Sequence, residues 1–315
     1  MADIVLTPTK AKPQLREATA WDQVKHNRNW LGFWFMLPAM GFLIFFLAYP
    51  LGLGIWLSFT NWQFLKSTTP PPFEGLGAYR TIFASPAFWS AFGHTWFWTA
   101  GTLVVEIGLG LPLALLLSRP TRVSGVAISL LLLPWVTPFV VVSYSWLYLL
   151  GNGGPVHSLL HSMGIVGAAS PLASPALALP VLTVISGWKG LPFMTVALLA
   201  ARRSIDESLY EAARIDGAGS FQQFRRISLP LMRSTLIVMS VVLGILAFYS
   251  FDLVWLLTQG GPGASSEITG IMIYQEFFLQ GAPGAAAAIG VSMFVILLLV
   301  GGLVLTLTRV NRSEP

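Results

Sequence analysis

Long apolar stretches recur six times along the chain, and polar connections separate them. An α-helix rises about 1.5 Å per residue, so about 20 apolar residues suffice to cross the roughly 30 Å hydrocarbon core of a bilayer. Most of the stretches exceed that minimum, which permits tilt or a short interfacial helix at one end. The pattern predicts an all-α, polytopic membrane protein with six transmembrane helices, at residues 30–59, 88–118, 125–150, 176–201, 234–257 and 282–308.

The same pattern sets the expected domain organisation. Residues 1–29 are polar and run into an apolar stretch longer than a signal-peptide core, so we interpret them as a tail that is not cleaved. Residues 30–308 form one membrane domain that contains a long polar loop at 202–233, and residues 309–315 form a second tail. The connections on the other side are rich in proline and glycine, as at residues 260–263, and are expected to be turns and loops.

Lysine and arginine are distributed unevenly among these segments. The two tails, the turn after the second predicted helix and the 202–233 loop together hold 15 of the 18 basic residues. Basic residues accumulate on the cytoplasmic side of membrane proteins. Both termini are therefore expected to face the cytoplasm. This topology and contact with membrane lipid account for the net charge of +5, so we expect no binding of nucleic acid.

Composition excludes several functional classes. Apolar residues make up 55% of the chain and charged residues only 10%. Cysteine is absent, which excludes disulfides and thiolate metal sites. His157 and His161 stand four residues apart, but two ligands are too few for a metal site. We find no nucleophile with a histidine base and no G-x-x-x-x-G-K-[ST] phosphate loop, so we expect no catalytic residue, no metal and no bound cofactor.

The 202–233 loop contains the signals of two short helices. Ser204 and Glu207 have the spacing of a capping box, and Gly217 is suited to the positive φ with which helices commonly end. Ser220 and Gln223 repeat the capping pattern, and Pro230 is expected to close the second helix. The sequence predicts a helical elbow in this loop. One interpretation is an interfacial helix pair whose arginines face anionic lipid.

A longer motif favours a second interpretation. The string Glu211-Ala212-Ala213-x-x-x-Gly217 is followed, after nine residues, by Ile227-x-Leu229-Pro230. This spacing resembles the EAA loop of ATP-binding-cassette (ABC) import permeases, in which the loop is a coupling helix that docks on an ATPase subunit. The coupling residues implied by the resemblance are Glu211, Ala212, Ala213, Asp216, Gly217, Ile227, Leu229 and Pro230.

The resemblance extends over residues 31–309 and is strongest to the carbohydrate-uptake branch related to maltose and glycerol-phosphate systems. It is supported by Trp188-Lys189 in the fourth predicted helix and by Phe251-Asp252 in the fifth. It implies a permease, not an enzyme, in the inner membrane of a bacterium. The implied partners are a second homologous permease that completes a heterodimer, two ATPase subunits that use ATP and Mg, and an extracytoplasmic sugar-binding protein.

Three charged residues, Glu106, Lys189 and Asp252, lie well inside the predicted helices. Charges are costly in lipid unless they face a cavity or a partner. We expect structural roles for Glu106 and Asp252 and a role in the transport pathway for Lys189. The substrate-pathway residues implied by the resemblance are Ser186, Lys189, Gly190, Phe193, Leu246, Ala247 and Ser250. Simple helix packing is the alternative role for these residues.

An ion-gradient-driven secondary transporter or channel is the alternative function, with one of the three intramembrane charges as the coupling group. The chain shows no inverted internal repeat, which weighs against that class. The sequence does not choose among glycerol phosphate, a disaccharide and an oligosaccharide as the cargo.

Overall fold

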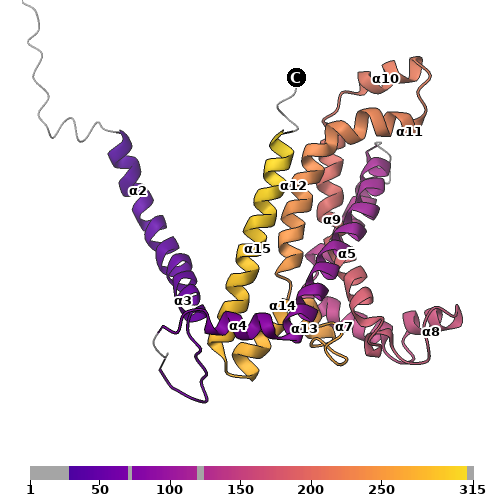
Figure 1. Cartoon of the computed structure of the whole chain (residues 1–315). Helices are drawn as coiled ribbons and strands as arrows, with labels where there is room; N and C mark the ends of the chain where they lie inside the picture. Colours follow the sequence, from indigo (N-terminus) through magenta and orange to yellow (C-terminus); the bar gives the residue numbers. More distant parts are fainter. Residues whose placement is uncertain (1–27, 70–72, 119–123, 311–315) are drawn as a thin grey trace, which may run out of the picture. The chain divides into compact units, whose positions relative to one another are not determined.

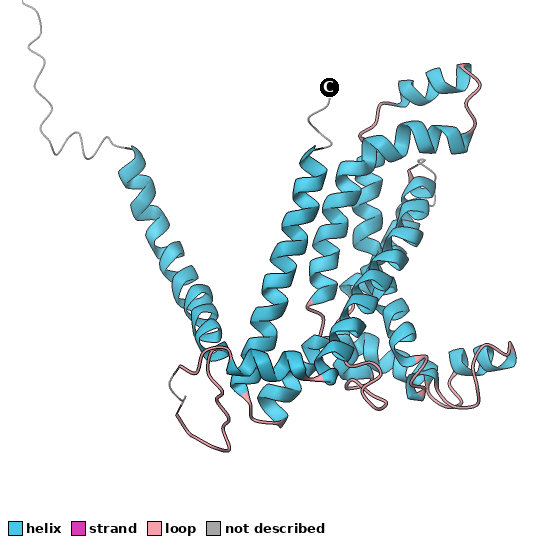
Figure 2. Cartoon of the chain, in the orientation of Figure 1, coloured by secondary structure: helices cyan, strands magenta, loops and turns pink. Residues whose placement is uncertain are grey.

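The computed structural model describes residues 28–69, 73–118 and 124–310, and these residues form helices and loops without a β-strand (Figure 2). This confirms the predicted all-α class. Most of the N-terminal tail and the basic turn at 119–123 lie outside the described residues. The chain divides into two compact units, Met1–Gly54 and Ile55–Pro315.

The described part of the first unit is one long helical segment, whose last turn continues beyond Gly54. It comprises α2 (Arg28–Leu43), a π-helical turn η1 (Ile44–Ala48) and α3 (Tyr49–Ser58). In η1 the backbone N–H of Tyr49 donates to the carbonyl of Ile44, five residues earlier. Pro50 follows directly, and proline has no N–H and clashes with the preceding turn. The wider π turn allows the helix to continue past Pro50.

The second unit contains the remaining helices, and Figure 1 shows α10 and α11 at one end of it and α4 and α8 at the other. Its elements, in chain order, are α4 (Gly77–Ala84), α5 (Pro86–Leu117), α6 (Ser124–Val136), α7 (Phe139–Leu150), α8 (Pro155–Ser162), η2 (Pro171–Ala173), α9 (Ala178–Arg203), α10 (Glu207–Ile215), α11 (Ser220–Gln223), η3 (Phe224–Ser228), α12 (Leu229–Phe248), α13 (Asp252–Leu257), α14 (Thr269–Tyr274), η4 (Gln275–Leu279) and α15 (Pro283–Val310).

Five described helices are long and apolar enough to cross a membrane, and they match five of the six predicted helices. The prediction of a single helix at 125–150 was wrong, because α6 and α7 meet there at an angle of 96°. Pro138 is the N-cap of α7 and has no N–H, so the carbonyl of Pro134 lacks its helical partner at the bend. Together the two bent helices have the length and apolar composition of a sixth span.

The fifth predicted helix, 234–257, is also interrupted. It ends at Phe248, and residues 249–251 separate it from α13. The expectation that the proline- and glycine-rich connections are only turns and loops was wrong as well, because α4, α8 and α14 lie in them. Amphipathic stretches of these connections bury apolar residues, for example Ala78 and Ile82 of α4. The predicted turn at 260–263 is confirmed, with positive φ at Gly260 and Gly263.

The helices α5 and α9 cross closely because glycine lies at the contact. A Cβ built on Gly187 of α9 would lie 2.5 Å from the Cβ of Val105, and one on Gly101 of α5 would lie 2.6 Å from Cγ2 of Thr183. Distances below 3.0 Å force one of the two atoms to move. Small residues let transmembrane helices approach in this way. This crossing fixes the position of the middle of α9 relative to α5.

We expect Gly187→Ala to destabilise the protein by about 1–3 kcal/mol, because the added methyl group overpacks the crossing. Gly108→Ala is the matched control, since Gly108 lies on α5 with open space around its Cα. Thermal unfolding of the purified variants measures the difference. Equal unfolding temperatures for the two variants would contradict the assigned role of Gly187.

Candidate functional site

The first helix of the predicted elbow, α10, starts at a different cap from the one expected. Asp206 is the N-cap, and its carboxylate accepts a hydrogen bond from the backbone N–H of Ser208 at 3.0 Å. The predicted capping box on Ser204 was wrong. Ser204 still has helical backbone angles as the end of α9, and its hydroxyl donates to the carbonyl of Ala201 at 2.8 Å. The helix before the elbow therefore extends further than predicted.

The end of α10 is a Schellman motif. Gly217 has φ of +79°, which confirms the predicted positive φ. Its N–H donates to the carbonyl of Arg214 at 3.1 Å, and the N–H of Ala218 donates to the carbonyl of Ala213 at 2.8 Å. These bonds satisfy carbonyls that the end of a helix leaves free. The geometry gives the chain a sharp and well-defined reversal after α10.

The second helix of the elbow does not end where predicted. Its N-cap is Gly219, with no side-chain cap, and Gln223 instead donates to the carbonyl of Ala218 at 2.8 Å. Pro230 does not close it, because the helix continues through η3 into α12. In η3 the N–H of Leu229 donates to the carbonyl of Phe224, so a π turn again directly precedes a proline. The second helix of the elbow and α12 are thus one continuous helical segment.

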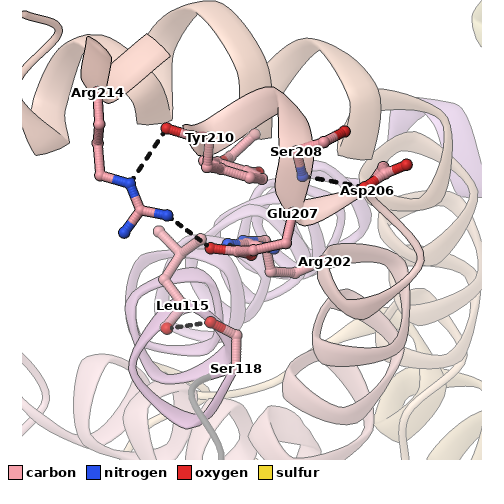
Figure 3. Close-up of polar contacts among 9 residues, drawn as sticks. Leu115, Ser118, Arg202, Asp206, Glu207, Ser208, Tyr210 and Arg214 are labelled. Carbon is pink, nitrogen blue, oxygen red and sulfur yellow. Dashed lines mark hydrogen bonds and ion pairs between the residues drawn. The ribbon is translucent and has the colours of Figure 1, made fainter. Parts of the chain in front are cut away.

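Side-chain contacts hold α10 against the ends of α9 and α12. The hydroxyls of Tyr210 and Ser228 are both buried and lie 2.9 Å apart, which ties α10 to η3. The guanidinium of Arg202 lies 3.9 Å from the centroid of the Tyr210 ring. Glu207 makes ion pairs of 3.4 Å with both Arg202 and Arg214 (Figure 3). Exposed ion pairs add little stability, so the buried Tyr210–Ser228 hydrogen bond is the main contact that holds α10 against η3.

The predicted coupling residues lie on this elbow and at its junction with α12. Glu211, Ala212, Asp216 and Gly217 are exposed, and Ala213 is half-buried. At the junction, Ile227 and Leu229 are half-buried and Pro230 is exposed. Within the described part of the chain Glu211 makes no ion pair, in contrast to Glu207. The free carboxylate and the small side chains beside it form a surface that another protein can approach closely.

The N-cap of α10 should make its stability depend on pH. Hydrogen bonds from Ser208 lower the pKa of Asp206. The cap therefore stabilises α10 fully above the unfolded pKa of about 3.9 and is lost as the pH falls through the lower folded value. We expect the amide of Ser208 to lose protection from hydrogen exchange in acid in the wild type, but much less in Asp206→Asn, which caps without titrating. The same acid response in both proteins would contradict this.

A cavity of about 510 Å³ lies between the middle of α9 and the end of α12. All seven predicted substrate-pathway residues line it, and they are Ser186, Lys189, Gly190, Phe193, Leu246, Ala247 and Ser250. The first four belong to α9, and the other three lie on or just after α12. Two segments separated by more than 50 residues in the sequence thus meet at one hollow.

Lys189 does not have its ammonium free in the cavity. Its Nζ donates hydrogen bonds to the carbonyls of Pro134 at 3.0 Å and Thr137 at 2.7 Å. These carbonyls lie at the end of α6, where the break leaves them without helical partners. The ammonium also lies 4.5 Å from the ring centroid of Phe139. Lys189 thus caps the broken helix with a positive charge, as the helix dipole favours.

Sequence reasoning placed Glu106 and Asp252 outside the site, yet both line the same cavity. Glu106 is buried and comes from α5, whereas Asp252 is exposed and begins α13. The signal that could have found them was their charge inside apolar segments. Aromatic side chains form another part of the wall, where the rings of Trp135 and Phe193 stack with centroids 5.9 Å apart. The cavity combines flat apolar faces with a few polar groups, as small-molecule sites generally do.

His157 and His161 stack on α8, with ring centroids 6.0 Å apart. Ring nitrogens of the two residues lie within hydrogen-bond distance of the carbonyls of Gly167 and Val166. Among the described residues no group of three or more histidine, cysteine or acidic side chains could hold a metal ion.

Comparison with known proteins agrees with this architecture. Residues 106–310 match the family of binding-protein-dependent transport system inner membrane components. The chain is 30% identical to the trehalose/maltose transport system permease protein MalF of Thermococcus litoralis, over 88% of this chain and 92% of that protein. It is 31% identical to the trehalose transport system permease protein SugA of Mycobacterium tuberculosis, over 84% of each.

The fold also matches a solved structure of a bacterial ABC transporter involved in the import of the acidic polysaccharide alginate. The TM-score is 0.78 at 24% identity, with coverage of 93% of this chain and 99% of the other. At that identity the likeness supports the fold alone. The family match and the two permease relatives establish that this chain belongs to the binding-protein-dependent inner membrane permeases of ABC importers.

Proposed function

We propose that this permease forms half of a sugar pathway and that its elbow, α10 to η3, is the part on which an ATPase subunit acts. The observation that carries the proposal is the continuity of α11 and η3, the second half of the elbow, with α12. A displacement of the elbow reaches α12 directly through η3, and the far end of α12 lines the cavity through Leu246 and Ala247. The same helix therefore joins a surface suited to docking with the candidate cargo site.

The coupling residues have the properties that a docking surface requires. Glu211 offers an exposed carboxylate to a basic group of the ATPase. The small residues Ala212 and Gly217 let the backbone of another protein approach α10 closely. The apolar side chains of Ile215 and Phe221 are 87% and 74% exposed, and an interface would bury them. The buried hydrogen bond between Tyr210 and Ser228 would transmit a displacement of α10 to the N-terminal end of α12.

A sugar is the cargo that the site favours. The two permease relatives are named for trehalose or maltose transport. Aromatic faces such as those of Trp135 and Phe193 suit the apolar faces of sugar rings, and hydroxyl side chains such as Ser186 suit sugar hydroxyls. Lys189 supports the wall by holding α6 at its break. Alternating access of this cavity would carry the sugar inward.

The complete transporter in this proposal has three further subunits and a binding protein that delivers the cargo. A second homologous permease completes the pathway as a heterodimer, two ATPase subunits bind ATP and Mg, and an extracytoplasmic binding protein delivers the sugar. Both termini and the elbow face the cytoplasm, which fits the basic residues around the elbow. Residues 30–308 form the permease domain, with its coupling loop at 202–233 and short tails at 1–29 and 309–315.

Reconstitution tests this function against an ion-gradient mechanism. The complex co-purified from native membranes is placed in proteoliposomes with its binding protein, and uptake of radiolabelled trehalose and maltose is measured. We expect uptake to require ATP and to persist when an uncoupler collapses the proton gradient. Uptake that needs no ATP, or that stops with the uncoupler, would support the secondary transporter instead.

A further inference from the structure

A second cavity, of about 830 Å³, lies beside the elbow and shares no residue with the cavity between α9 and α12. We call it the elbow cavity. Its wall is formed by the ends of α5 and α9 and by one face of α10, and Figure 3 shows Ser118, Arg202 and Arg214 around it. The proposed coupling residues Glu211 and Ala212 are not part of its lining. The elbow cavity therefore belongs to neither the cargo site nor the docking surface.

Positive charge exceeds negative charge in the elbow cavity. Its lining includes three arginines and two acidic residues, namely Arg202, Arg203, Arg214, Asp206 and Glu207. Both carboxylates are engaged within the chain. Asp206 accepts the N-cap hydrogen bond of α10, and Glu207 forms its two ion pairs with Arg202 and Arg214. The remaining positive charge is that of Arg203.

Arg203 is held at the cavity by a neutral acceptor. Its Nη2 donates to the carbonyl of Leu117, the last residue of α5, at 3.2 Å, and it makes no ion pair in the described part of the chain. The free carbonyls at the end of a helix favour a positive charge there. A guanidinium has five N–H donors, so this one bond leaves others for a ligand. Arg203 thus offers an anion both charge and hydrogen bonds.

The elbow cavity lies where two membrane-spanning helices end. The apolar segments Pro86–Leu117 and Ala178–Arg203 finish at its wall, and the headgroup layer of a bilayer begins where the hydrocarbon core stops. Leu116, two residues before Ser118, is 71% exposed, so apolar surface adjoins the charged wall. A phospholipid combines a phosphate with apolar chains and matches both surfaces. A soluble phosphate matches only the charged one.

The lipid-side and protein-side faces of α10 are different. Glu207, Tyr210 and Arg214 are three and four residues apart and all line the elbow cavity, so they share one face of α10. Ala212 is exposed on the opposite side of the helix. A lipid on the first face would leave the second free for another protein. The two interpretations of the loop sequence, a helix pair facing anionic lipid and a coupling helix, are therefore compatible.

We propose that the elbow cavity binds the phosphate of an anionic phospholipid headgroup, with Arg203 as the main contact and the open donors of Arg202 and Arg214 beside it. Guanidinium groups bind phosphate oxygens through paired, charge-assisted hydrogen bonds. Basic pockets between transmembrane helices at the cytoplasmic side bind lipid headgroups. The bound lipid would join the ends of α5 and α9 to α10. This site does not depend on which cargo the transporter carries.

Photocrosslinking of lipids to the complete transporter tests the site. The co-purified complex is reconstituted in phosphatidylcholine vesicles that contain a trace of photoactivatable phosphatidylglycerol or, in parallel, photoactivatable phosphatidylcholine with the same diazirine. Mass spectrometry of peptides measures the yield at the ends of α5 and α9 and on α10. We expect a yield about fivefold or more higher from the phosphatidylglycerol probe, which is the effect of one basic side chain on an anionic lipid.

Arg203→Gln and Arg233→Gln form a matched pair of variants. Arg233 is exposed on α12, does not line the elbow cavity and makes no ion pair among the described residues. We expect Arg203→Gln to lower the phosphatidylglycerol yield about fivefold and Arg233→Gln to leave it unchanged. Ser118→Glu adds a carboxylate to the wall without removing an arginine and should also lower the yield. It decides the question if Arg203→Gln fails to assemble.

Competition distinguishes a lipid from a soluble anion, because inorganic phosphate offers the same kind of oxygens. We expect unlabelled phosphatidylglycerol in the vesicles to displace the probe, and millimolar inorganic phosphate at constant ionic strength to leave it bound. Displacement by inorganic phosphate would identify a site for soluble phosphate and overturn the lipid assignment. Equal yields from the two lipid probes in the wild type, or equal effects of Arg203→Gln and Arg233→Gln, would overturn it as well.

Discussion

Replacing Glu211 by lysine is expected to abolish ATP-driven uptake while leaving the permease folded. Glu211 is exposed on α10, makes no ion pair in the described structure and belongs to the predicted coupling surface. Lysine would place like charge against a basic group of the ATPase, and like charges at an interface cost several kcal/mol. Uptake into proteoliposomes and co-purification of the ATPase subunits measure the effect, and we expect at least a 100-fold loss of uptake.

Glu207→Gln is the control for this prediction. Glu207 lies one turn before Glu211 on the same helix, but its carboxylate is already engaged by Arg202 and Arg214. Its loss removes contacts within the chain, and those exposed pairs contribute little. We expect Glu207→Gln to retain most of the uptake. The assignment of Glu211 fails if Glu211→Lys retains both the ATPase subunits and uptake.

Lys189→Met is expected to produce the largest loss of stability among these substitutions. The ammonium satisfies the carbonyls of Pro134 and Thr137 at the break between α6 and α7. Methionine has similar length and no donor, so both carbonyls would lose their bonds. Each charge-assisted hydrogen bond contributes about 1.5–3 kcal/mol, and we expect a destabilisation of roughly 3 kcal/mol or more.

The exposed Lys66 provides the matched control, because within the described residues its side chain makes no hydrogen bond that Lys66→Met would break. Thermal unfolding of the two purified variants gives the comparison. We expect a clearly lower unfolding temperature for Lys189→Met alone. A wild-type unfolding temperature for Lys189→Met would show that the break does not depend on this ammonium.

The positions of the membrane helices followed from the sequence because apolar length is a local property. The break at 137–138 did not, because proline alone does not predict it. Pro112 and Pro192 lie inside unbroken helices, whereas Pro138 is the N-cap of a new one. The difference is tertiary, since Lys189, more than 50 residues away, satisfies the carbonyls that the break exposes.

The elbow shows the same division between local and long-range information. Gly217 identified the end of α10, because positive φ is a local requirement. The start of α10 was misplaced, because α9 runs on to Arg203 and so keeps Ser204 in a helical conformation. In the cavity, resemblance located the residues of α9 and α12. Glu106 was noticed for its charge but placed outside the site, because its position beside Gly190 depends on the packing of α5 against α9, which no local pattern encodes.

The central claim, that force on the elbow reaches the cavity, can be tested by labelling a single cysteine at position 246. The chain has no native cysteine. In the Leu246→Cys variant, maleimide that reacts with this chain therefore reports on position 246 alone. Leu246 is 63% exposed and lines the cavity. The measurement is the rate of maleimide labelling in the reconstituted transporter, with and without ATP and the loaded binding protein.

We predict that ATP changes the labelling rate several-fold when Glu211 is intact, and that the rate does not respond when Glu211→Lys is added to the same chain. An equal response to ATP in both proteins would contradict the account, because the cavity would then open and close without the elbow.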